Sequence, residues 1–264
     1  EFNKEYFFTE VIGSDSLCNL TLLKTLKLPK DFKYVSFSNN PKPVSPGTFL
    51  LGLTYALEFE LSPNMGLMQS RESTFGRTLF PTKMIRGSLV LGPGEVGGPV
   101  FDLNGEFVGI THASLPDLSA SFILPAKACS RIRDDLILSG SVDYGWFGIT
   151  VSKKLSKENS FDIVIKSPGS NKKLQIGDIL KKIGSYAIHD SGDILNSTFY
   201  SRPGTYVEFS IVREGKEMII PVRVAPRSSI SRKAEMLSSS IDSNESNTSN
   251  ITSEVITRQD VIKD

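Results

Sequence analysis

A glycine-dense turn followed by a predicted hairpin constrains this chain more than any other stretch. It runs from Leu91 to Ala113 and reads LGPGEVGGPVFDLNGEFVGITHA. The segment Gly94–Pro99 predicts a tight turn. The Asn104-Gly105 pair between two apolar runs predicts a two-residue hairpin turn, because both residues tolerate positive φ. The strands are expected at Pro99–Leu103 and Glu106–Ile110. Such a turn is a natural place for backbone N–H groups to face an anion.

The same stretch resembles the active-site loop of trypsin-like serine proteases, and of the HtrA family in particular. The family pattern is Pro-Gly-Asn-Ser-Gly-Gly-Pro, a strand, an Asn-Gly or Asp-Gly turn and Val-Ile-Gly-Ile, and it matches from Pro93 to Ile110. The resemblance places the oxyanion loop at Gly94, Glu95 and Val96, with the nucleophilic serine at Val96. Valine has no group that can attack a carbonyl. The resemblance therefore implies the fold while the catalytic pattern is broken at its centre.

A second match to the same family lies near the start of the chain. The sequence VIGSD at Val11–Asp15 leads into NLTLLK at Asn19–Lys24, where HtrA-type proteases have Asp-Leu-Ala-Leu-Leu-Lys. The resemblance places the triad aspartate at Asn19, which can accept a bond from an imidazole but cannot stabilise its positive charge. The alternative is that Asn19 is a plain turn residue. Strands are predicted over Tyr6–Ile12 and Leu20–Leu23, with a turn at Gly13–Ser16.

No member of the catalytic triad is intact by this comparison. The chain has two histidines, His112 and His189. His112 follows the predicted hairpin and His189 belongs to the second domain, whereas the family's base would precede Glu1. Ser88 is the candidate for a substitute nucleophile. The sequence shows no basic partner for it, so a structural role is favoured.

The predicted fold is mainly β: a trypsin-like double β-barrel with an incomplete first barrel, followed by a PDZ domain. The protease-like domain is expected over 1–138, with residues 1 to about 40 supplying the last strands of the first barrel. Unpaired strand edges would remain. The chain is therefore expected either to be a processed product or fragment, or to have its first barrel completed by other residues or another protein.

An amphipathic helix is predicted to close this domain over Ala126–Leu138. Its apolar stripe is expected at Ala128, Ile132 and Leu136. The charged residues of the helix are expected to face solvent: Arg131, Arg133, Asp134 and Asp135.

After a short linker at 139–142, the segment 143–227 is similar to the PDZ domains that follow the protease in HtrA proteins. The matching motifs, in order, are GWFGI, SPGS, IGDIL, RPG and VREGKE. A helix is predicted over Gly192–Tyr200 with Ser191 or Asp190 as its N-cap. Two strands, Tyr206–Arg213 and Lys216–Val224, are predicted to pair across Glu214-Gly215.

The PDZ resemblance implies a peptide site in which the ligand adds a strand and loop N–H groups hold its carboxylate. The loop would be 146–149, and the groove would lie between the strand that follows it and the predicted helix. The implied peptide-binding residues are Trp146, Phe147, Gly148, Ile149, Val151, Leu195 and Phe199. The alternative is that these apolar residues form the core of a small domain, and for Leu195 and Phe199 the two interpretations are equally supported.

Composition limits the remaining classes of function. A net charge of +1 over 264 residues argues against a nucleic-acid partner. Apolar runs stay below the roughly 20 residues needed to span a bilayer, and no signal-peptide pattern is present. Cys18 and Cys129 lack metal-ligand spacing, so two buried thiols are favoured over a disulfide. We expect no cofactor or metal. The Ser/Asn-rich segment 228–264 is expected to be disordered.

Three hypotheses about function stay open at this point. The first is a proteolytically inactive HtrA-type homologue that binds peptide or protein carboxyl termini and unfolded proteins. The second is an active serine endopeptidase, which family membership would suggest. The third is a fragment without an independent role. By resemblance alone, the location is periplasmic or secreted, and a homo-oligomer is an expected form.

Overall fold

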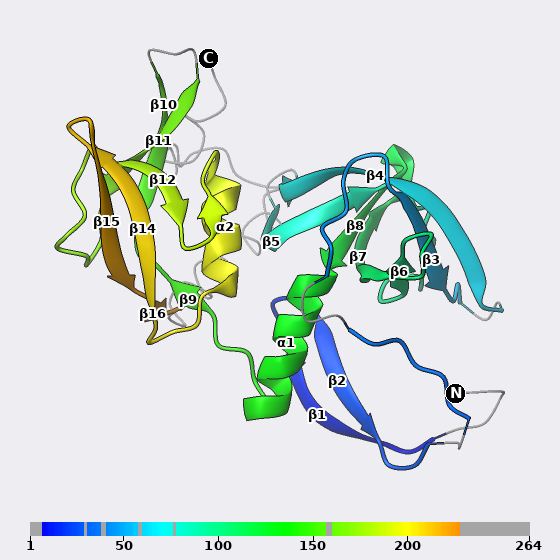
Figure 1. Cartoon of the computed structure of the whole chain (residues 1–264). Coiled ribbons are helices and arrows are strands. Elements are labelled where there is room, and N and C mark those ends of the chain that lie inside the picture. Colours follow the sequence, from blue (N-terminus) through cyan, green and yellow to red (C-terminus); the bar gives the residue numbers. More distant parts are fainter. Residues whose placement is uncertain are drawn as a thin grey trace, which may run out of the picture. The chain divides into compact units, whose positions relative to one another are not determined.

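The computed structural model describes residues 7–28, 31–37, 41–57, 60–75, 78–156 and 160–227. The chain divides into two compact units between Val142 and Asp143, shown in Figure 1. Strands dominate both units, so the prediction of a mainly β fold is confirmed. The segment 228–264, predicted to be disordered, lies outside the described residues.

The N-terminal unit begins with a two-stranded antiparallel sheet, formed by β1 (Thr9–Asp15) and β2 (Leu20–Thr25). The predicted turn at Gly13–Ser16 is wrong, because β1 continues to Asp15 and the turn occupies 16–19. The buried carboxylate of Asp15 accepts the N–H groups of Leu17 and Cys18, at 3.4 and 3.0 Å, and this closes the turn later than expected. Of the predicted first strand, Tyr6 lies outside the described residues, and Phe7 and Phe8 precede β1.

Six strands of the same unit close into a barrel in the order β3-β4-β5-β8-β7-β6. Its core is a cluster of buried aliphatic side chains that includes Leu50, Ile85 and Ile123. A short 3₁₀ helix, η1 (Pro116–Leu118), connects β7 to β8. The strands are β3 (Phe49–Thr54), β4 (Ser62–Phe75), β5 (Thr78–Gly87), β6 (Pro99–Phe101), β7 (Phe107–Leu115) and β8 (Ala120–Pro125).

The connection between β6 and β7 differs from the predicted two-residue turn. Gly105 donates its N–H to Asp102 (3.1 Å), and Asp102 donates to Glu106 (3.0 Å). Of the Asn-Gly pair, Gly105 has a positive φ of 76° and Asn104 does not. This is a four-residue turn followed by a bulge. The carboxylate of Asp102 also accepts the N–H groups of Asn104 and Glu106, which favours the longer loop and shortens both strands.

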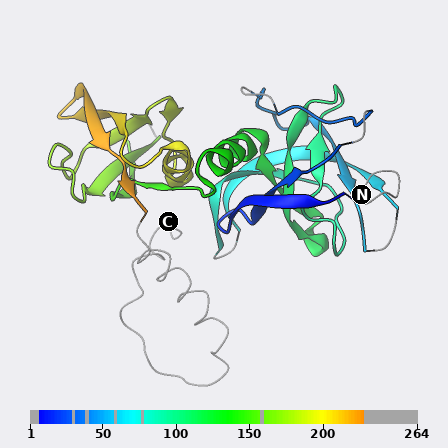
Figure 2. The same cartoon turned by 90° about the horizontal axis from the view of Figure 1, so that it is seen from below.

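Helix α1 (Ala126–Ser139) ends at Gly140, which has a φ of 72°. Its predicted apolar stripe is buried, but the prediction that Arg131 and Asp135 face solvent is wrong. These two residues lie one helical turn apart, with their side-chain N and O atoms 3.5 Å from each other. Opposite charges at this spacing reduce the cost of burial. The helix packs against β1 and β7, and Figure 2 shows it beside them from below.

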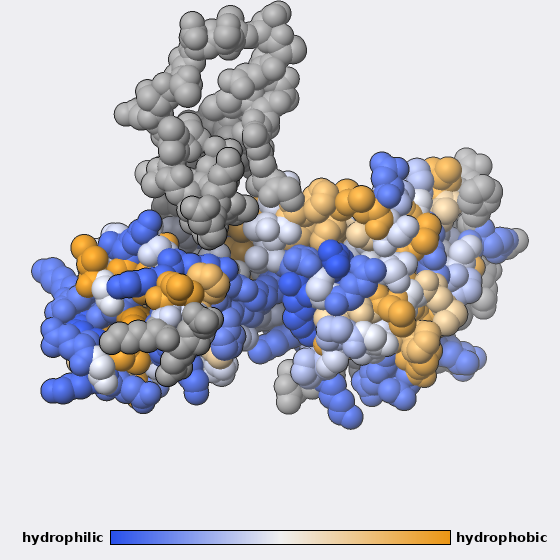
Figure 3. Space-filling model, turned by 90° about the horizontal axis from the view of Figure 1, so that it is seen from above, coloured by the Kyte–Doolittle hydropathy of each residue, from blue (hydrophilic) through white to orange (hydrophobic). Residues whose placement is uncertain are grey.

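The outer face of β3 and β4 carries exposed apolar side chains. Phe49 and Leu67 are cross-strand neighbours and both are exposed, as is Met65 on the same face. The intervening Leu50 points into the barrel and is fully buried, as strand alternation requires. Hydrophobic surface on the N-terminal unit is visible in Figure 3.

The C-terminal unit is built around a sheet with the strand order β10-β11-β12-β14-β15, to which β13 adds beside β12. A separate pair joins β9 to β16. Helix α2 (Ser191–Tyr200) has Asp190 as its N-cap, one of the two predicted caps, and begins one residue before the predicted start. The strands are β9 (Gly145–Trp146), β10 (Thr150–Leu155), β11 (Phe161–Ser167), β12 (Ile179–Ile183), β13 (Tyr186–Ala187), β14 (Tyr206–Arg213), β15 (Lys216–Arg223) and β16 (Ala225–Pro226).

Candidate functional site

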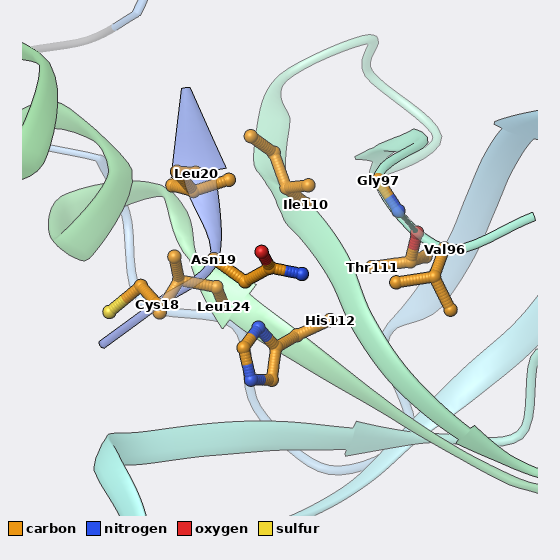
Figure 4. Close-up of a pocket in the computed structure, with 9 residues that line it drawn as sticks. All are labelled: Cys18, Asn19, Leu20, Val96, Gly97, Ile110, Thr111, His112 and Leu124. Atoms are coloured by element: carbon orange, nitrogen blue, oxygen red, sulfur yellow. Dashed lines mark hydrogen bonds between the residues drawn. The ribbon is translucent and has the colours of Figure 1, made fainter. Parts of the chain in front are cut away.

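A pocket of about 90 Å³ in the N-terminal unit lies where the turn before β2 meets the glycine loop before β6. It brings Asn19 and Val96 together, the two positions that the sequence assigned to a degraded triad (Figure 4). The lining residues are Cys18, Asn19, Leu20, Val96, Gly97, Ile110, Thr111, His112 and Leu124.

The hydroxyl of Thr111 holds the glycine loop from the barrel side. It accepts the N–H groups of Gly97 and Gly98, at 3.0 and 2.9 Å, and lies 3.1 Å from the carbonyl oxygen of Glu95, to which it can donate. Figure 4 shows the bond between Gly97 and Thr111. Thr111 is buried, so these bonds are shielded from water. One buried side chain therefore fixes the backbone on both sides of Val96.

The carboxylate of Glu95 is a second anchor. One oxygen accepts a 2.6 Å hydrogen bond from the hydroxyl of Thr54 at the end of β3, and the other accepts the N–H of Gly92. Glu95 is buried and is absent from the pocket lining. Its role is thus to hold the loop, because its two carboxylate oxygens are already engaged by groups of the barrel and the loop itself.

Val96 stands at the tip of this loop with 47% of its surface exposed. Gly94 and Gly97 have φ values of 86° and 99°, which a residue with a side chain rarely adopts. Within the described part of the chain, the N–H groups of Gly94 and Val96 have no acceptor. The loop can therefore donate hydrogen bonds to an anionic oxygen, but the side chain at its tip cannot attack a carbonyl.

Asn19 is exposed at the end of the turn that Asp15 closes, and its φ is 52°. Asparagine tolerates this left-handed conformation better than most residues, because its short amide can bond locally. The turn interpretation and the triad-position interpretation are therefore compatible. The backbone explains an asparagine here, and the pocket places it opposite the glycine loop.

The structure adds His112 to the site, which the sequence had left unassigned. His112 lies on β7 two residues after Ile110, at an irregularity in the pairing with β8 between Thr111 and Ala113, and both side chains line the pocket. Burial lowers the pKa of its imidazole below 6.5, and a hydrogen bond to the backbone of Cys18 offsets this in part. At pH 7 His112 is therefore mainly neutral. Its nearness in sequence to Ile110 could have suggested a shared site, but nothing in the sequence connects it with the distant turn at Cys18.

The pocket offers no replacement nucleophile among its nine lining residues. The hydroxyl of Thr111 is buried and occupied by the loop. The thiol of Cys18 is fully buried. Ser88 lies outside the lining and accepts the N–H of Leu67 at 2.9 Å, which fits the structural role predicted for it. Among the described residues, no cluster of three or more His, Cys, Asp or Glu side chains could hold a metal ion.

The loop 146–149 of the C-terminal unit is the other candidate site. Phe147 is buried against Phe209, with ring centroids 5.1 Å apart, whereas Trp146 is 44% exposed. Gly148 follows these two residues and has a φ of 68°. In the described structure, the N–H groups of residues 147–149 have no acceptor. Three successive free donors are a suitable cradle for a carboxylate.

Strand β10 follows this loop and forms one edge of the sheet, pairing with β11. Ile149 and Val151 are partly buried against the same core as Ile194 of α2. The two helix residues singled out in the sequence differ: Leu195 is partly exposed, and Phe199 is buried with its ring 5.4 Å from that of Tyr144. Phe199 therefore supports the unit from inside.

Comparisons with known proteins find relatives of both the sequence and the fold. The chain is 26% identical over 231 residues to a probable periplasmic serine endoprotease, DegP-like, of Rhizobium meliloti, covering 81% of this chain and 45% of the relative. It is 25% identical over 244 residues to a protein of the same description from Marinomonas sp., covering 85% and 50%. No family model matches.

Solved structures show the same relationship. The HtrA-type protease AlgW with a decapeptide aligns with a TM-score of 0.59 and 20% identity, over 84% of this chain and 72% of that one. In sequence and in fold, the chain is similar to HtrA-type, trypsin-like serine proteases. A serine endoprotease from Yersinia pestis aligns with a TM-score of 0.53 and 19% identity, over 83% and 76%.

The similarity to these proteins extends into both units, because the alignments cover more than four fifths of the chain. The predicted trypsin-like β-barrel fold is thereby confirmed. The chain spans about half the length of the curated relatives that it matches. Among the described residues, no helix is both long and apolar enough to cross a membrane.

Proposed function

We propose that this chain is a proteolytically inactive HtrA-type homologue that binds peptide and protein carboxyl termini instead of cleaving them. The observation that carries the proposal is Val96. Hydrogen bonds to Thr111 and Glu95 hold the glycine loop around Val96 in place, yet the side chain at the tip of the loop is an exposed valine.

Serine-protease chemistry needs a nucleophile, a base that takes its proton and a carboxylate that orients the base and stabilises its positive charge. Position 96 has no hydroxyl, and position 19 has an amide in place of a carboxylate. The imidazole in the pocket, His112, is mainly neutral, but it has no serine to activate. The chemistry that this pocket retains is hydrogen bonding to a bound oxygen.

Peptide binding is proposed for the C-terminal unit, as a PDZ domain over 143–227. Two features support this assignment: the free N–H groups of residues 147–149, and the edge strand β10 directly after them. An extended peptide can add beside β10 while its carboxylate occupies the loop. Structures of the neighbour AlgW contain a decapeptide or a tripeptide, which is consistent with this class of ligand.

The curated relatives are described as periplasmic. We therefore propose a location outside the cytoplasm, where unfolded proteins would supply carboxyl termini to the C-terminal unit. We also propose that copies of this chain associate into a homo-oligomer.

The test for inactivity treats the full chain with a fluorophosphonate probe and with an unfolded protein substrate. The natural chain is expected to be neither labelled nor active. The Val96→Ser, Asn19→Asp double variant serves as comparison, and its labelling alone would show that the loop still supports an activated serine. Labelling or turnover by the natural chain would overturn the claim of inactivity.

The test for peptide binding uses Trp146, the single tryptophan of the chain, as a fluorescent reporter inside the proposed site. A peptide that ends in an apolar residue with a free carboxylate is expected to change its emission in a saturable way. The same peptide with an amidated end is expected to bind much more weakly, because the amide removes the charge held by the loop. Equal binding of the two would contradict the proposed carboxylate site.

A further inference from the structure

We infer that the peptide site of the C-terminal unit selects ligands with an acidic side chain about four residues before an apolar carboxyl-terminal residue, and that Lys153 forms an ion pair with this side chain. The inference rests on the proposed peptide binding and adds the chemistry of the ligand. It follows from the positions of the side chains along β10.

The alternation of β10 places Lys153 on the face of the sheet that carries the core. Val151 is paired with Ile165 and Lys153 with Ile163, and both β11 partners are buried core residues. Lys153 is exposed because β10 is the edge strand and the core side chains end there. Moving away from the carboxylate loop, the same face of β10 therefore changes from apolar at Val151 to cationic at Lys153.

No acidic side chain of the described residues pairs with Lys153. Its direct cross-strand neighbour is the apolar Ile163. Lys154 differs, because it lies on the opposite face beside Asp162, whose carboxylate already binds Lys181 at 2.8 Å. Lys153 is thus the cation of β10 that a bound peptide can pair with on the core side of the sheet.

The position of the acid in the ligand follows from strand geometry. A peptide that pairs antiparallel with β10 advances one residue for each residue of that strand, about 3.3 Å. With its carboxylate at the N–H groups of 147–149, its last side chain lies near Ile149. The residue beside Lys153 is then four positions earlier. Ile149, Val151 and Ile194, which line the shared core, favour an apolar last residue.

The experiment compares two labelled peptides that share an apolar last residue and differ by Glu or Gln four positions before it. Binding to the full chain is measured by fluorescence polarisation at low ionic strength. The Glu peptide is expected to bind about two- to fivefold more tightly, as an exposed ion pair allows, and to lose this advantage in high salt. The Lys153→Glu variant is expected to reverse the preference.

The matched control is Lys154→Glu, an equal charge change at the neighbouring position on the other face, which is expected to keep the preference for Glu. Equal binding of the two peptides, or the same response to both substitutions, would overturn the role of Lys153 while leaving peptide binding intact. Failure of both peptides to bind would overturn the proposed function, and the inference with it.

Discussion

The carboxylate of Glu95 accepts a 2.6 Å hydrogen bond from the hydroxyl of Thr54, 41 positions earlier in the chain. This contact ties the glycine loop to the end of β3, on the other side of the loop from Thr111. Gly98 lies close to the same strand, since an added Cβ would come within 2.7 Å of the carbonyl oxygen of Leu53. The loop at Val96 is therefore a packed part of the barrel.

Replacing Glu95 with alanine is expected to destabilise the N-terminal unit by about 1–3 kcal/mol. The substitution leaves the hydroxyl of Thr54 and the N–H of Gly92 without their acceptor in a buried site. Calorimetry measures the change, with Trp146 fluorescence identifying the separate transition of the C-terminal unit. Glu106→Ala on the exposed hairpin is the control, expected within about 0.5 kcal/mol of the natural chain. An equally small effect at Glu95 would show that the loop is held by other contacts.

His112 is predicted to titrate below its ordinary value of 6.5, because burial disfavours the charged imidazole. The folded-state pKa is depressed, so its contribution to stability is complete above about pH 6.5 and is lost as the pH falls through the folded value. NMR titration of the ring protons checks the pKa, with His189→Gln assigning the two histidine signals. His112→Gln is expected to flatten the pH dependence of the unfolding midpoint between about pH 7 and pH 5. A His112 midpoint at or above 6.5 would contradict the burial argument.

Gly169→Ala is expected to weaken both stability and peptide binding. An added Cβ would lie 2.0 Å from the carbonyl oxygen of Gly148, so the backbone of the carboxylate loop would have to move. Gly177→Ala is a matched control, because it shares the left-handed conformation but has no atom within 4 Å of the added Cβ. The control is expected to cost about 1–2 kcal/mol of stability with unchanged affinity. Loss of affinity in both variants would show that conformation, not the contact with Gly148, is responsible.

Asp178 and Arg213 make the C-terminal unit sensitive to acid. Burial raises the pKa of Asp178, but hydrogen bonds from Arg213 at 2.7 and 2.8 Å and from the N–H of Gln175 outweigh it, so the pKa lies below 3.8. This stabilisation is present above the unfolded value of about 3.9 and is lost as the pH falls through the folded value.

Asp178→Asn is therefore expected to lower the urea midpoint at pH 6 and to reduce its fall between about pH 4 and pH 2.5, as followed by Trp146 emission. Asp162→Asn, which removes a more exposed pair with Lys181, is expected to change the midpoint little. If the Asp178 variant kept the full acid dependence, other carboxylates would have to carry it.

Two predicted hairpins show how far local sequence determines structure here. Glu214 and Gly215 both adopt positive φ, at 51° and 78°, and connect β14 to β15 as the predicted two-residue turn. The Asn104-Gly105 pair does not, because the carboxylate of the preceding Asp102 accepts the N–H of Glu106, which a two-residue turn would pair with Leu103, and that of Asn104 as well. The strands were predictable from alternation, whereas competition by a neighbouring side chain decided the turn.

Contacts between distant segments account for the features that the sequence did not predict. The burial of Arg131 and Asp135 depends on what packs against α1, which its own periodicity does not contain. The contact of His112 with the Cys18 turn joins segments that are far apart in the sequence. By contrast, Asn19 and Val96 line one pocket, as expected from the two motifs that resemble the HtrA pattern.

The two cysteines have a consequence for how the chain can be produced and handled. Cys18 and Cys129 are both buried and form no disulfide. Burial raises the pKa of Cys129 to about 12, so almost no thiolate forms there at neutral pH. No sulfur–sulfur bond holds the fold together. The chain should therefore reach the same structure in a reducing cytosol as in an oxidising compartment, without an oxidant or a disulfide isomerase.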